Sequence, residues 1–369
     1  MQKATETVLE IDLNALAQNY RYLTSKIDKD TQVMGVVKAF GYGSDSVAVA
    51  EELITLGVSY FAVAYPDEGI SLRKAGIETS ILVLHPLPAT FKKITDSCME
   101  PAIYSRSMLT EFIDFAEENG LTDYPIHLKF NTGLNRLGFI ADDIDFISEK
   151  TTATSSVKIK SMFTHLAASE DIAETAFTEA QLSQFKDISE KIISEIGYKP
   201  LLHTLNTSGV LNYPEAQYDM VRTGIGLYGF GNDPEQNKHL KPVATLKTVI
   251  SQIHTVKKGE TVGYNRAFKA SEATKTATLP VGHADGIKRI FGNRKGWVTV
   301  DGKKAPIVGN VCMDMIMIDV TDIDCEEGDE VIVFGENPSA DELSQVINTI
   351  PYELITGVSQ RVKRVICRK

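Results

Sequence analysis

Short apolar runs alternate with amphipathic stretches over the N-terminal part of the chain. The apolar runs cover residues 33–37, 60–64, 81–84, 101–104, 126–130, 157–164, 201–205 and 220–222. Most of them are separated by stretches with the apolar spacing of a helix, at residues 44–56, 67–75, 108–118 and 177–196. Eight strand–helix units within about 200 residues are what a (β/α)8 TIM barrel requires. We therefore predict such a barrel.

A doubly wound parallel sheet would show the same alternation of strands and helices. A sheet of that kind often binds a dinucleotide at a glycine-rich turn after an early strand. None of the early strand–helix turns in this sequence carries that glycine pattern. The barrel is therefore the favoured α/β fold.

The pattern changes after a polar, turn-rich stretch at residues 229–238. Beyond it, tight turns such as Asp301-Gly302 separate apolar runs at 244–253, 276–281, 297–300, 315–320 and 330–334. Only residues 341–350 have helical spacing, and residues 361–369 alternate like a terminal strand. The sequence therefore predicts two domains, an α/β barrel over residues 1–236 and a mostly-β domain over residues 237–369.

Composition narrows the class of protein. The chain has 369 residues, of which 43% are hydrophobic and 24% charged, so it is neither disordered nor fibrous. With 38 Lys+Arg against 49 Asp+Glu its net charge is −11, and no basic stripe suggests a nucleic acid or a membrane surface as a partner. No apolar run has the length of a membrane span and no secretory signal opens the chain, so we expect a cytoplasmic protein.

The four cysteines point to neither disulfides nor a metal. Cys98, Cys312, Cys325 and Cys367 are scattered, and no Cys-x-x-Cys pair occurs. A disulfide framework or a cysteine zinc site would need closer spacing, so we expect no bound metal.

In a barrel, catalytic side chains lie at the carboxyl ends of the strands. Lys38 ends the first apolar run of the predicted barrel. Burial of an ammonium group is costly unless its pKa falls, and a desolvated lysine is what Schiff-base chemistry requires. The competing interpretation is a lysine that extends from the barrel rim into solvent.

Later strand ends add further polar groups. The fifth run contains Lys129 and is followed by Arg136, and His165 follows the sixth, where it could also be a hydrogen-bonded core histidine. The last two strand ends carry Asn206, Thr207, Arg222, Gly224 and Ile225. Asn206, Thr207 and the backbone of residues 224–226 would suit a phosphate, which barrels often bind after their last strands.

These strand ends, together with motifs further along, resemble bacterial alanine racemases. The motifs are Val37-Lys38-Ala39 with Tyr42-Gly43, His127-Leu-Lys129, Arg136-Leu-Gly, Thr164-His165, Asn206-Thr207-Ser208, Arg222-Thr-Gly-Ile-Gly, Val262-Gly-Tyr264, Ala284-Asp-Gly and Cys312-Met313-Asp314. The resemblance extends nearly from end to end. It implies the cofactor pyridoxal 5′-phosphate (PLP), a fold-type III barrel followed by a β domain, and a head-to-tail homodimer.

The resemblance also implies a role for each matching residue. Lys38 would hold PLP covalently and serve as one base, while Tyr264 would reach into the partner's site as the opposite base, supported there by His165 and Arg222. Arg222 would contact the pyridine nitrogen, Arg136 the phenolic oxygen and the substrate, and Met313 the substrate carboxylate. Lys129 matches a lysine that is often carbamylated in the family. The phosphate would be bound by Tyr42, Asn206, Thr207, Gly224, Ile225 and Tyr352.

We therefore expect interconversion of L- and D-alanine, which supplies D-alanine for peptidoglycan. Phe40 and Gly41, and also His283 and Asn310, depart from the family pattern. The last two are expected near the substrate corridor, so a racemase for serine or another small amino acid is an alternative. A fold-type III PLP decarboxylase or aldolase, and a PLP carrier made of a barrel alone, are further alternatives. The β domain with Tyr264 argues against both.

Overall fold

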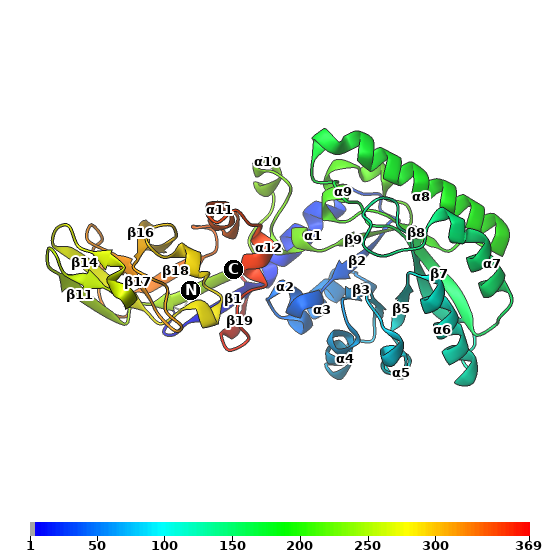
Figure 1. Cartoon of the computed structure of the whole chain (residues 1–369), viewed down its shortest axis with the longest axis horizontal. Helices are drawn as coiled ribbons and strands as arrows, with labels where there is room; N and C mark the ends of the chain where they lie inside the picture. Colours follow the sequence, from blue (N-terminus) through cyan, green and yellow to red (C-terminus); the bar gives the residue numbers. More distant parts are fainter. Residues whose placement is uncertain (1–3) are drawn as a thin grey trace.

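The computed structural model describes residues 4–369 and contains two regions that lie end to end along the long axis of the molecule (Figure 1). The larger region is a barrel of eight parallel strands in the order β8-β7-β6-β5-β4-β3-β2-β9. Its strands are β2 (Gln32–Val36), β3 (Tyr60–Val63), β4 (Ser80–Val83), β5 (Glu100–Ile103), β6 (Tyr124–Lys129), β7 (Val157–Phe163), β8 (Leu201–His203) and β9 (Met220–Thr223). Each falls on one of the eight predicted runs, which confirms the predicted barrel.

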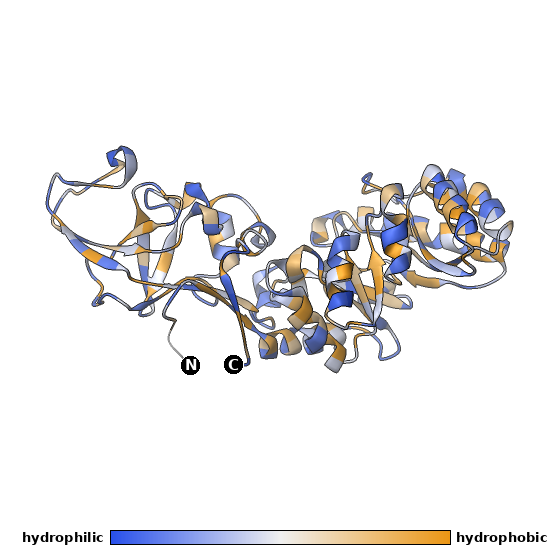
Figure 2. Cartoon of the chain, turned by 90° about the horizontal axis from the view of Figure 1, so that it is seen from below, coloured by the Kyte–Doolittle hydropathy of each residue, from blue (hydrophilic) through white to orange (hydrophobic). Residues whose placement is uncertain are grey.

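Backbone hydrogen bonds close the barrel between β8 and β9, the strands at the two ends of this order. The Asp219 amide donates to the Leu202 carbonyl at 3.1 Å, and the Arg222 amide donates to the Leu205 carbonyl at 2.9 Å. Strands β3 and β5 are buried at every residue, because side chains of one face fill the barrel and those of the other face pack under helices. Figure 2 shows strands of the barrel region mostly in the hydrophobic colour, among helices of mixed hydropathy.

The barrel helices bury one face each. In α6 (Arg106–Glu118) the buried residues are spaced like one helical stripe, at Met108, Leu109, Phe112, Ile113 and Ala116. The side chain of Ser105 caps this helix by accepting from the Met108 amide at 3.3 Å. The other helices of this region are α1 (Leu13–Thr24), α2 (Lys38–Tyr42), α3 (Ser46–Thr55), α4 (Pro66–Lys74), α5 (Phe91–Asp96), α7 (Ile144–Thr152), α8 (Thr175–Ile196), α9 (Thr207–Asn212) and α10 (Pro234–Asn237).

The second region is built on a nine-stranded sheet with the order β11-β14-β17-β16-β15-β18-β10-β1-β19. Its strands include β10 (Ala244–Val249), β11 (Gln252–Val256), β14 (Thr274–Leu279), β15 (Trp297–Val300), β16 (Lys303–Val308), β17 (Ile316–Asp319), β18 (Glu330–Phe334) and β19 (Lys363–Cys367). The short strands β12 (Thr261–Val262) and β13 (Phe268–Lys269) pair separately, and α11 (Ala340–Val346) and α12 (Pro351–Ile355) complete the region. The predicted mostly-β character is confirmed.

Several details differ from the sequence prediction. The run at 244–253 forms two strands, and β16 was not predicted because lysines and a proline interrupt its apolar pattern. Strands β15 and β16 form a hairpin whose two-residue turn, Asp301-Gly302, has positive φ at both residues, as tight hairpin turns favour. The predicted helix at 341–350 ends four residues early.

The first strand, β1 (Val8–Asp12), lies outside the barrel. It pairs antiparallel with β10 and parallel with β19 in the nine-stranded sheet. The expected first domain, residues 1–236, therefore includes a strand that the fold places in the other region, and its residues 1–3 lie outside the described chain. Leu9 and Ile11 alternate with polar residues, a pattern that predicts a strand but not which distant strand it pairs with.

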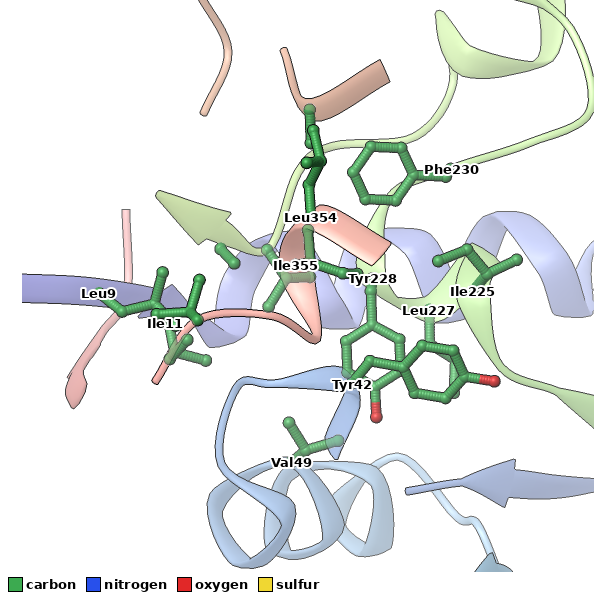
Figure 3. Packing of buried hydrophobic residues seen from close by; sticks show 14 of the residues in the cluster. Leu9, Ile11, Tyr42, Val49, Ile225, Leu227, Tyr228, Phe230, Leu354 and Ile355 are labelled. Atoms are coloured by element: carbon green, nitrogen blue, oxygen red, sulfur yellow. The ribbon is translucent and has the colours of Figure 1, made fainter. Parts of the chain in front are cut away.

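The two regions share one hydrophobic core. Leu9 and Ile11 of β1 belong to the same cluster of buried residues as Leu354 and Ile355 of α12 and Tyr42 of the barrel (Figure 3). Burial of apolar surface is the main favourable term in folding, so this continuous core fixes α12 at the barrel rim. Over residues 4–369, no helix combines the length and the apolar character that a membrane span needs.

Candidate active site

A cavity of about 710 Å³ opens at the carboxyl ends of the barrel strands. Residues from most of the strand ends line it, and this is the end of a barrel at which catalytic side chains lie. Every residue expected to bind the cofactor lines it, and Lys129 lines it too. These residues are Lys38, Tyr42, Lys129, Arg136, His165, Asn206, Thr207, Arg222, Gly224, Ile225 and Tyr352.

Lys38 enters the cavity from an unusual backbone turn. All five residues that follow it, Ala39 to Gly43, have positive φ, between 52° and 83°. Non-glycine residues pay about 1–3 kcal/mol each for such a conformation, so surrounding contacts must hold the turn. A Cβ atom at Gly43 would lie 2.1 Å from the Ile355 carbonyl oxygen of α12, so this close approach also requires glycine.

Glu68 is one group that holds this turn. Its carboxylate accepts from the backbone amides of Ala39 at 2.6 Å, Ala64 at 2.7 Å and Tyr65 at 3.1 Å. It therefore ties the end of β2 to the end of β3. Its charge also raises the pKa of Lys38, although burial and the charge of Arg136 lower that pKa overall. Glu68 could not be assigned a role from the sequence, where its only signal is that of an acidic residue in the first turn of α4.

The cavity is strongly cationic. Lys38, Lys129, Arg136 and Arg222 line it, and no aspartate or glutamate does so among the lining residues of the described chain. Burial, followed by the charges of the two arginines and Lys38, lowers the pKa of Lys129 to about 8. Burial and the same cations lower the pKa of His165 well below its ordinary value. The site therefore favours an anionic ligand.

Arg222 has hydrogen-bond acceptors on the side of its two Nη atoms. Its Nη1 atom donates to His203 Nδ1 at 2.6 Å and to the His203 carbonyl at 3.1 Å. Its Nη2 atom donates to the carbonyls of Thr164 at 2.7 Å and Thr204 at 2.9 Å. These bonds use four of its five N–H groups, and Nε–H has no acceptor within the described residues. Burial lowers the pKa of Arg222 to about 9, so it is still charged at neutral pH.

The last two strand ends form a cup of polar groups. The Thr207 hydroxyl accepts from the amides of Gly224 at 3.1 Å and Gly226 at 3.3 Å, and Asn206 caps α9 by accepting from the Gly209 amide at 2.8 Å. A Cβ atom at Gly224 would lie 2.4 Å from Tyr42 Oη, so only glycine allows Tyr42 to reach this point.

Tyr42 and Tyr352 supply hydroxyl groups to the same side of the cavity. Their rings lie 5.9 Å apart, and Tyr42 also stacks on Tyr228 at 4.5 Å. Burial raises the pKa of Tyr42 and raises that of Tyr352 to about 12. Both phenols therefore stay protonated at neutral pH, as hydroxyl donors that suit a phosphate.

Tyr264 and Met313 do not line the cavity. Tyr264 follows the short strand β12 and is 74% exposed, and Met313 is 58% exposed. Asn310 donates to the Tyr264 carbonyl at 3.1 Å, so this departure from the family pattern supports the tyrosine loop. His283 is exposed and also lies outside the cavity lining.

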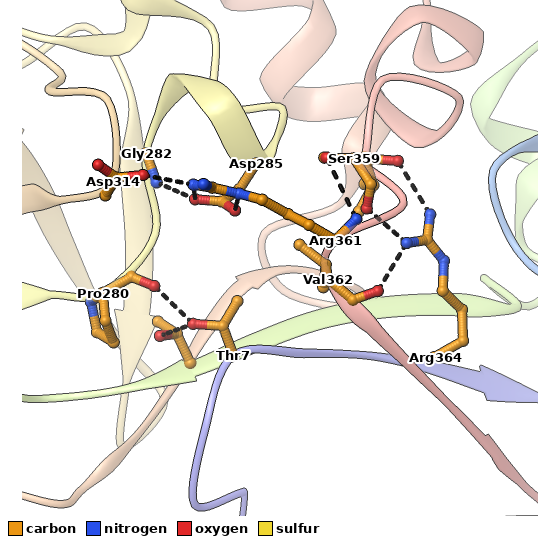
Figure 4. Close-up of polar contacts among 11 residues, drawn as sticks. Thr7, Pro280, Gly282, Asp285, Asp314, Ser359, Arg361, Val362 and Arg364 are labelled. Carbon is orange, nitrogen blue, oxygen red and sulfur yellow. Dashed lines mark hydrogen bonds and ion pairs between the residues drawn. The ribbon is translucent and has the colours of Figure 1, made fainter.

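Arg361 explains why two motifs of the second region contain aspartate. It binds Asp285 through both carboxylate oxygens, at 2.7 and 3.0 Å, and Asp314 at 2.7 Å (Figure 4). Bidentate arginine–carboxylate pairs fix geometry as well as charge. The pairs therefore hold the Ala-Asp-Gly loop beside the loop that carries Met313.

Known proteins resemble the chain over its whole length. The family models described as alanine racemase, N-terminal domain, and alanine racemase, C-terminal domain, match residues 11–232 and 243–366. The alanine racemase of Halothermothrix orenii is 35% identical over 366 residues, which cover 97% of this chain and 96% of that protein.

Solved structures agree with this match. The alanine racemase from a D-cycloserine-producing Streptomyces lavendulae has a TM-score of 0.93 and 30% identity, covering 100% of this chain and 98% of its own. That of Bartonella henselae with covalently bound pyridoxal phosphate has a TM-score of 0.90 and 28% identity, covering 99% and 100%. Because the two family models together match most of its residues, the chain belongs to the alanine racemase family.

Proposed function

We propose that the protein interconverts L- and D-alanine with pyridoxal 5′-phosphate as its cofactor. The observation that carries the proposal is the cavity that Lys38 shares with three other cations, with no aspartate or glutamate among its lining residues in the described chain. The phosphate and phenolic oxygen of PLP and the carboxylate of an amino acid are all anionic, so they fit this set of partners. We further propose that the reaction takes place in the cytoplasm and supplies D-alanine for peptidoglycan.

The residues of the cup would hold the phosphate group. Tyr42 and Tyr352 offer hydroxyl groups that stay protonated, and the absence of a side chain at Gly224 lets the Tyr42 hydroxyl reach the cup. Arg136 makes no hydrogen bond or ion pair within the described chain, so its guanidinium is available for the phenolic oxygen and the substrate carboxylate. When bound, PLP withdraws electrons from the substrate and so acidifies the α-proton.

Racemisation needs a base on each face of the substrate. Lys38 supplies one, because burial beside Arg136 lowers its pKa and makes the neutral amine accessible. Tyr264 supplies the other from the partner subunit of a head-to-tail homodimer. Support for the dimer is the exposure of Tyr264 outside the cavity of its own chain, together with the exposed Met313.

Arg222 would direct its remaining Nε–H group to the pyridine nitrogen. A guanidinium has donors only, so it can bind an unprotonated nitrogen but cannot stabilise a protonated one. Charge would therefore spread less into the ring than beside a carboxylate partner. The consequence is rapid return of a proton to the α-carbon and little transamination.

Lys129 would carry a carbamate. Carbamylation needs the neutral amine, and the lowered pKa of about 8 makes that form available near neutral pH. The resulting anion would then orient Arg136, one of the cations that lower this pKa.

The test is racemisation of each alanine enantiomer by the purified protein, with the visible absorbance of lysine-bound PLP and its loss on borohydride reduction as a second readout. We expect kcat/KM for alanine to exceed that for serine. A higher value for serine would favour the alternative racemase, and carbon dioxide release would favour a decarboxylase. Normal PLP binding without any racemisation would overturn the proposal.

A further inference from the structure

A line of four polar side chains crosses the interior of the barrel and ends on Arg222. We call Glu100, His127, Ser161 and His203 the barrel relay. Glu100 Oε2 lies 2.6 Å from His127 Nε2, and His127 Nδ1 lies 2.6 Å from Ser161 Oγ. Ser161 Oγ lies 2.8 Å from His203 Nε2, and His203 Nδ1 lies 2.6 Å from Arg222 Nη1. The relay takes one residue from each of β5, β6, β7 and β8.

The relay is buried and has no role in the function proposed above. His127, Ser161 and His203 have no exposed surface, and Glu100 is 9% exposed. A buried carboxylate is costly unless it is hydrogen-bonded or paired. Glu100 has two partners for this purpose, His127 and the Tyr60 hydroxyl, which donates to the same Oε2 atom.

Hydrogen-bond chemistry fixes where each proton of the relay lies. Arg222 can only donate, so His203 Nδ1 must be an unprotonated acceptor and Nε2–H must donate to Ser161. The Ser161 hydroxyl then donates to His127 Nδ1, and His127 Nε2–H donates to Glu100. In this arrangement every hydrogen meets an acceptor.

The opposite arrangement fails at a definite point. A proton on His127 Nδ1 would have to donate to Ser161, whose oxygen already accepts from His203. The Ser161 hydroxyl hydrogen would then have no acceptor, because the two histidines are its only hydrogen-bond partners in the described chain. Burial and the charge of Arg222 lower the pKa of His203, which agrees with a neutral ring that accepts through Nδ1.

We propose that Glu100 is a positioning residue for Arg222. It anchors the proton order of the relay, keeps His203 Nδ1 free to accept from Nη1, and so leaves Nε–H as the donor that faces the ligand. The step from Nε–H to the cofactor ring rests on the proposed function, whereas the proton order does not. If His203 carried its proton on Nδ1, two donors would face each other and the guanidinium would turn.

The proton order can be measured in the full chain without cofactor. Nitrogen-15 NMR of histidine-labelled protein distinguishes protonated from unprotonated ring nitrogens, and single His→Gln variants assign the signals. We expect His127 and His203 each to carry a proton on Nε2 only. A proton on Nδ1 of His203 in the unaltered protein would overturn the proposal.

Two conservative variants then test the coupling to Arg222. Glu100→Gln keeps the shape and one acceptor but removes the charge, and Ser161→Ala cuts the relay in the middle. We expect each to raise the ratio of transamination to racemisation, and the dissociation constant of PLP, by about three- to tenfold. The double variant should match Ser161→Ala alone, because the effect of Glu100 passes through Ser161.

A matched control separates positioning from stability. Glu330→Gln also removes a partly buried carboxylate, one whose oxygen lies 3.2 Å from Lys247 Nζ in the nine-stranded sheet. It should lower the melting temperature without changing the product ratio. Additive effects of Glu100→Gln and Ser161→Ala, or an unchanged product ratio in both, would refute the relay while leaving the proposed function intact. An unaltered protein that fails to bind PLP would refute the proposed function instead.

Discussion

The barrel mouth and the region that carries Tyr264 differ in what holds their functional side chains in place. At the barrel mouth, Arg222 has four of its N–H groups bonded and Lys38 stands on a turn held by Glu68. Tyr264, by contrast, is 74% exposed and its loop is fixed through its backbone by Asn310. The groups that line the cavity are thus held by their own chain. The Tyr264 loop is held through its backbone, while the tyrosine side chain lies outside that cavity.

The strongest test of this contrast mixes two inactive variants. Lys38→Ala and Tyr264→Ala should each abolish racemisation, because each removes one of the two proposed bases. After subunit exchange at equal concentration, half of the dimers are mixed and each holds one intact composite site, so about a quarter of the unaltered activity should return. Activity is measured with D-alanine.

Exchange itself is verified by mass spectrometry of differently tagged subunits. Mixed dimers without activity would place both bases in one subunit. The difference between the barrel mouth and the Tyr264 region would then have no bearing on catalysis.

Arg222→Lys tests the organised half. Lysine keeps the positive charge, but its three donors sit on one nitrogen in place of a planar guanidinium. It therefore cannot bind the same four acceptors and also supply a donor in the place of Nε–H. We expect racemisation to fall by about a hundredfold, as for loss of one preorganised donor, and transamination to gain in proportion. The exposed Arg21→Lys on α1 is the matched control. Equal rates for Arg222→Lys and the unaltered protein would show that Nε–H has no contact with the cofactor.

Lys129 makes the stability of the cofactor-free protein depend on pH. Its folded pKa of about 8 lies below the ordinary value of 10.5, so between these values the unfolded chain binds more protons and stability rises with pH. Below pH 8 the folded state bears the full cost of holding Lys129 protonated in the cavity, on the order of 2 kcal/mol after allowance for water there. Urea unfolding in carbonate-free buffer should show a smaller rise for Lys129→Gln than for the unaltered protein. Parallel curves would contradict the lowered pKa.

Glu68→Gln should have the smallest effect. An amide oxygen can accept two of the three backbone N–H groups, so we expect a loss of about 1–2 kcal/mol in the free energy of unfolding. Removal of the carboxylate should also lower the pKa of Lys38, since Glu68 raises it. The pH dependence of Lys38 acylation in cofactor-free protein measures this shift. Asp67→Asn, which removes an exposed pair with Lys93, should leave that profile unchanged.

Sequence patterns predicted the barrel and the residues around its mouth for one reason. Strand ends of a parallel barrel converge, so Lys38, Lys129, His165 and Arg222 could be placed together without knowledge of any contact. The same patterns could not reveal the relay. Its partners, such as Glu100 and His127, lie on neighbouring strands whose stagger only the closed barrel determines.

Other features depend on pairing over long distances. Strand β1 joins β10 and β19, more than two hundred residues away, and neither an apolar pattern nor a turn specifies that choice. Tyr264 was recognised only through a family motif, because an exposed tyrosine after a two-residue strand has no local signal of function.

The position of β1 has a topological consequence. Strands β1 and β10 are antiparallel neighbours, yet the chain between them, residues 13–243, contains the whole barrel. The barrel is thus an insertion into the connection between two adjacent strands. We call the segments that lead into and out of the barrel its stems, and a backbone hydrogen bond of 2.9 Å from the Asp12 amide to the Val243 carbonyl joins them. The hydrophobic core that the two regions share packs around these stems, so stems and core together set the distance between Lys38 and Tyr264 of the same chain.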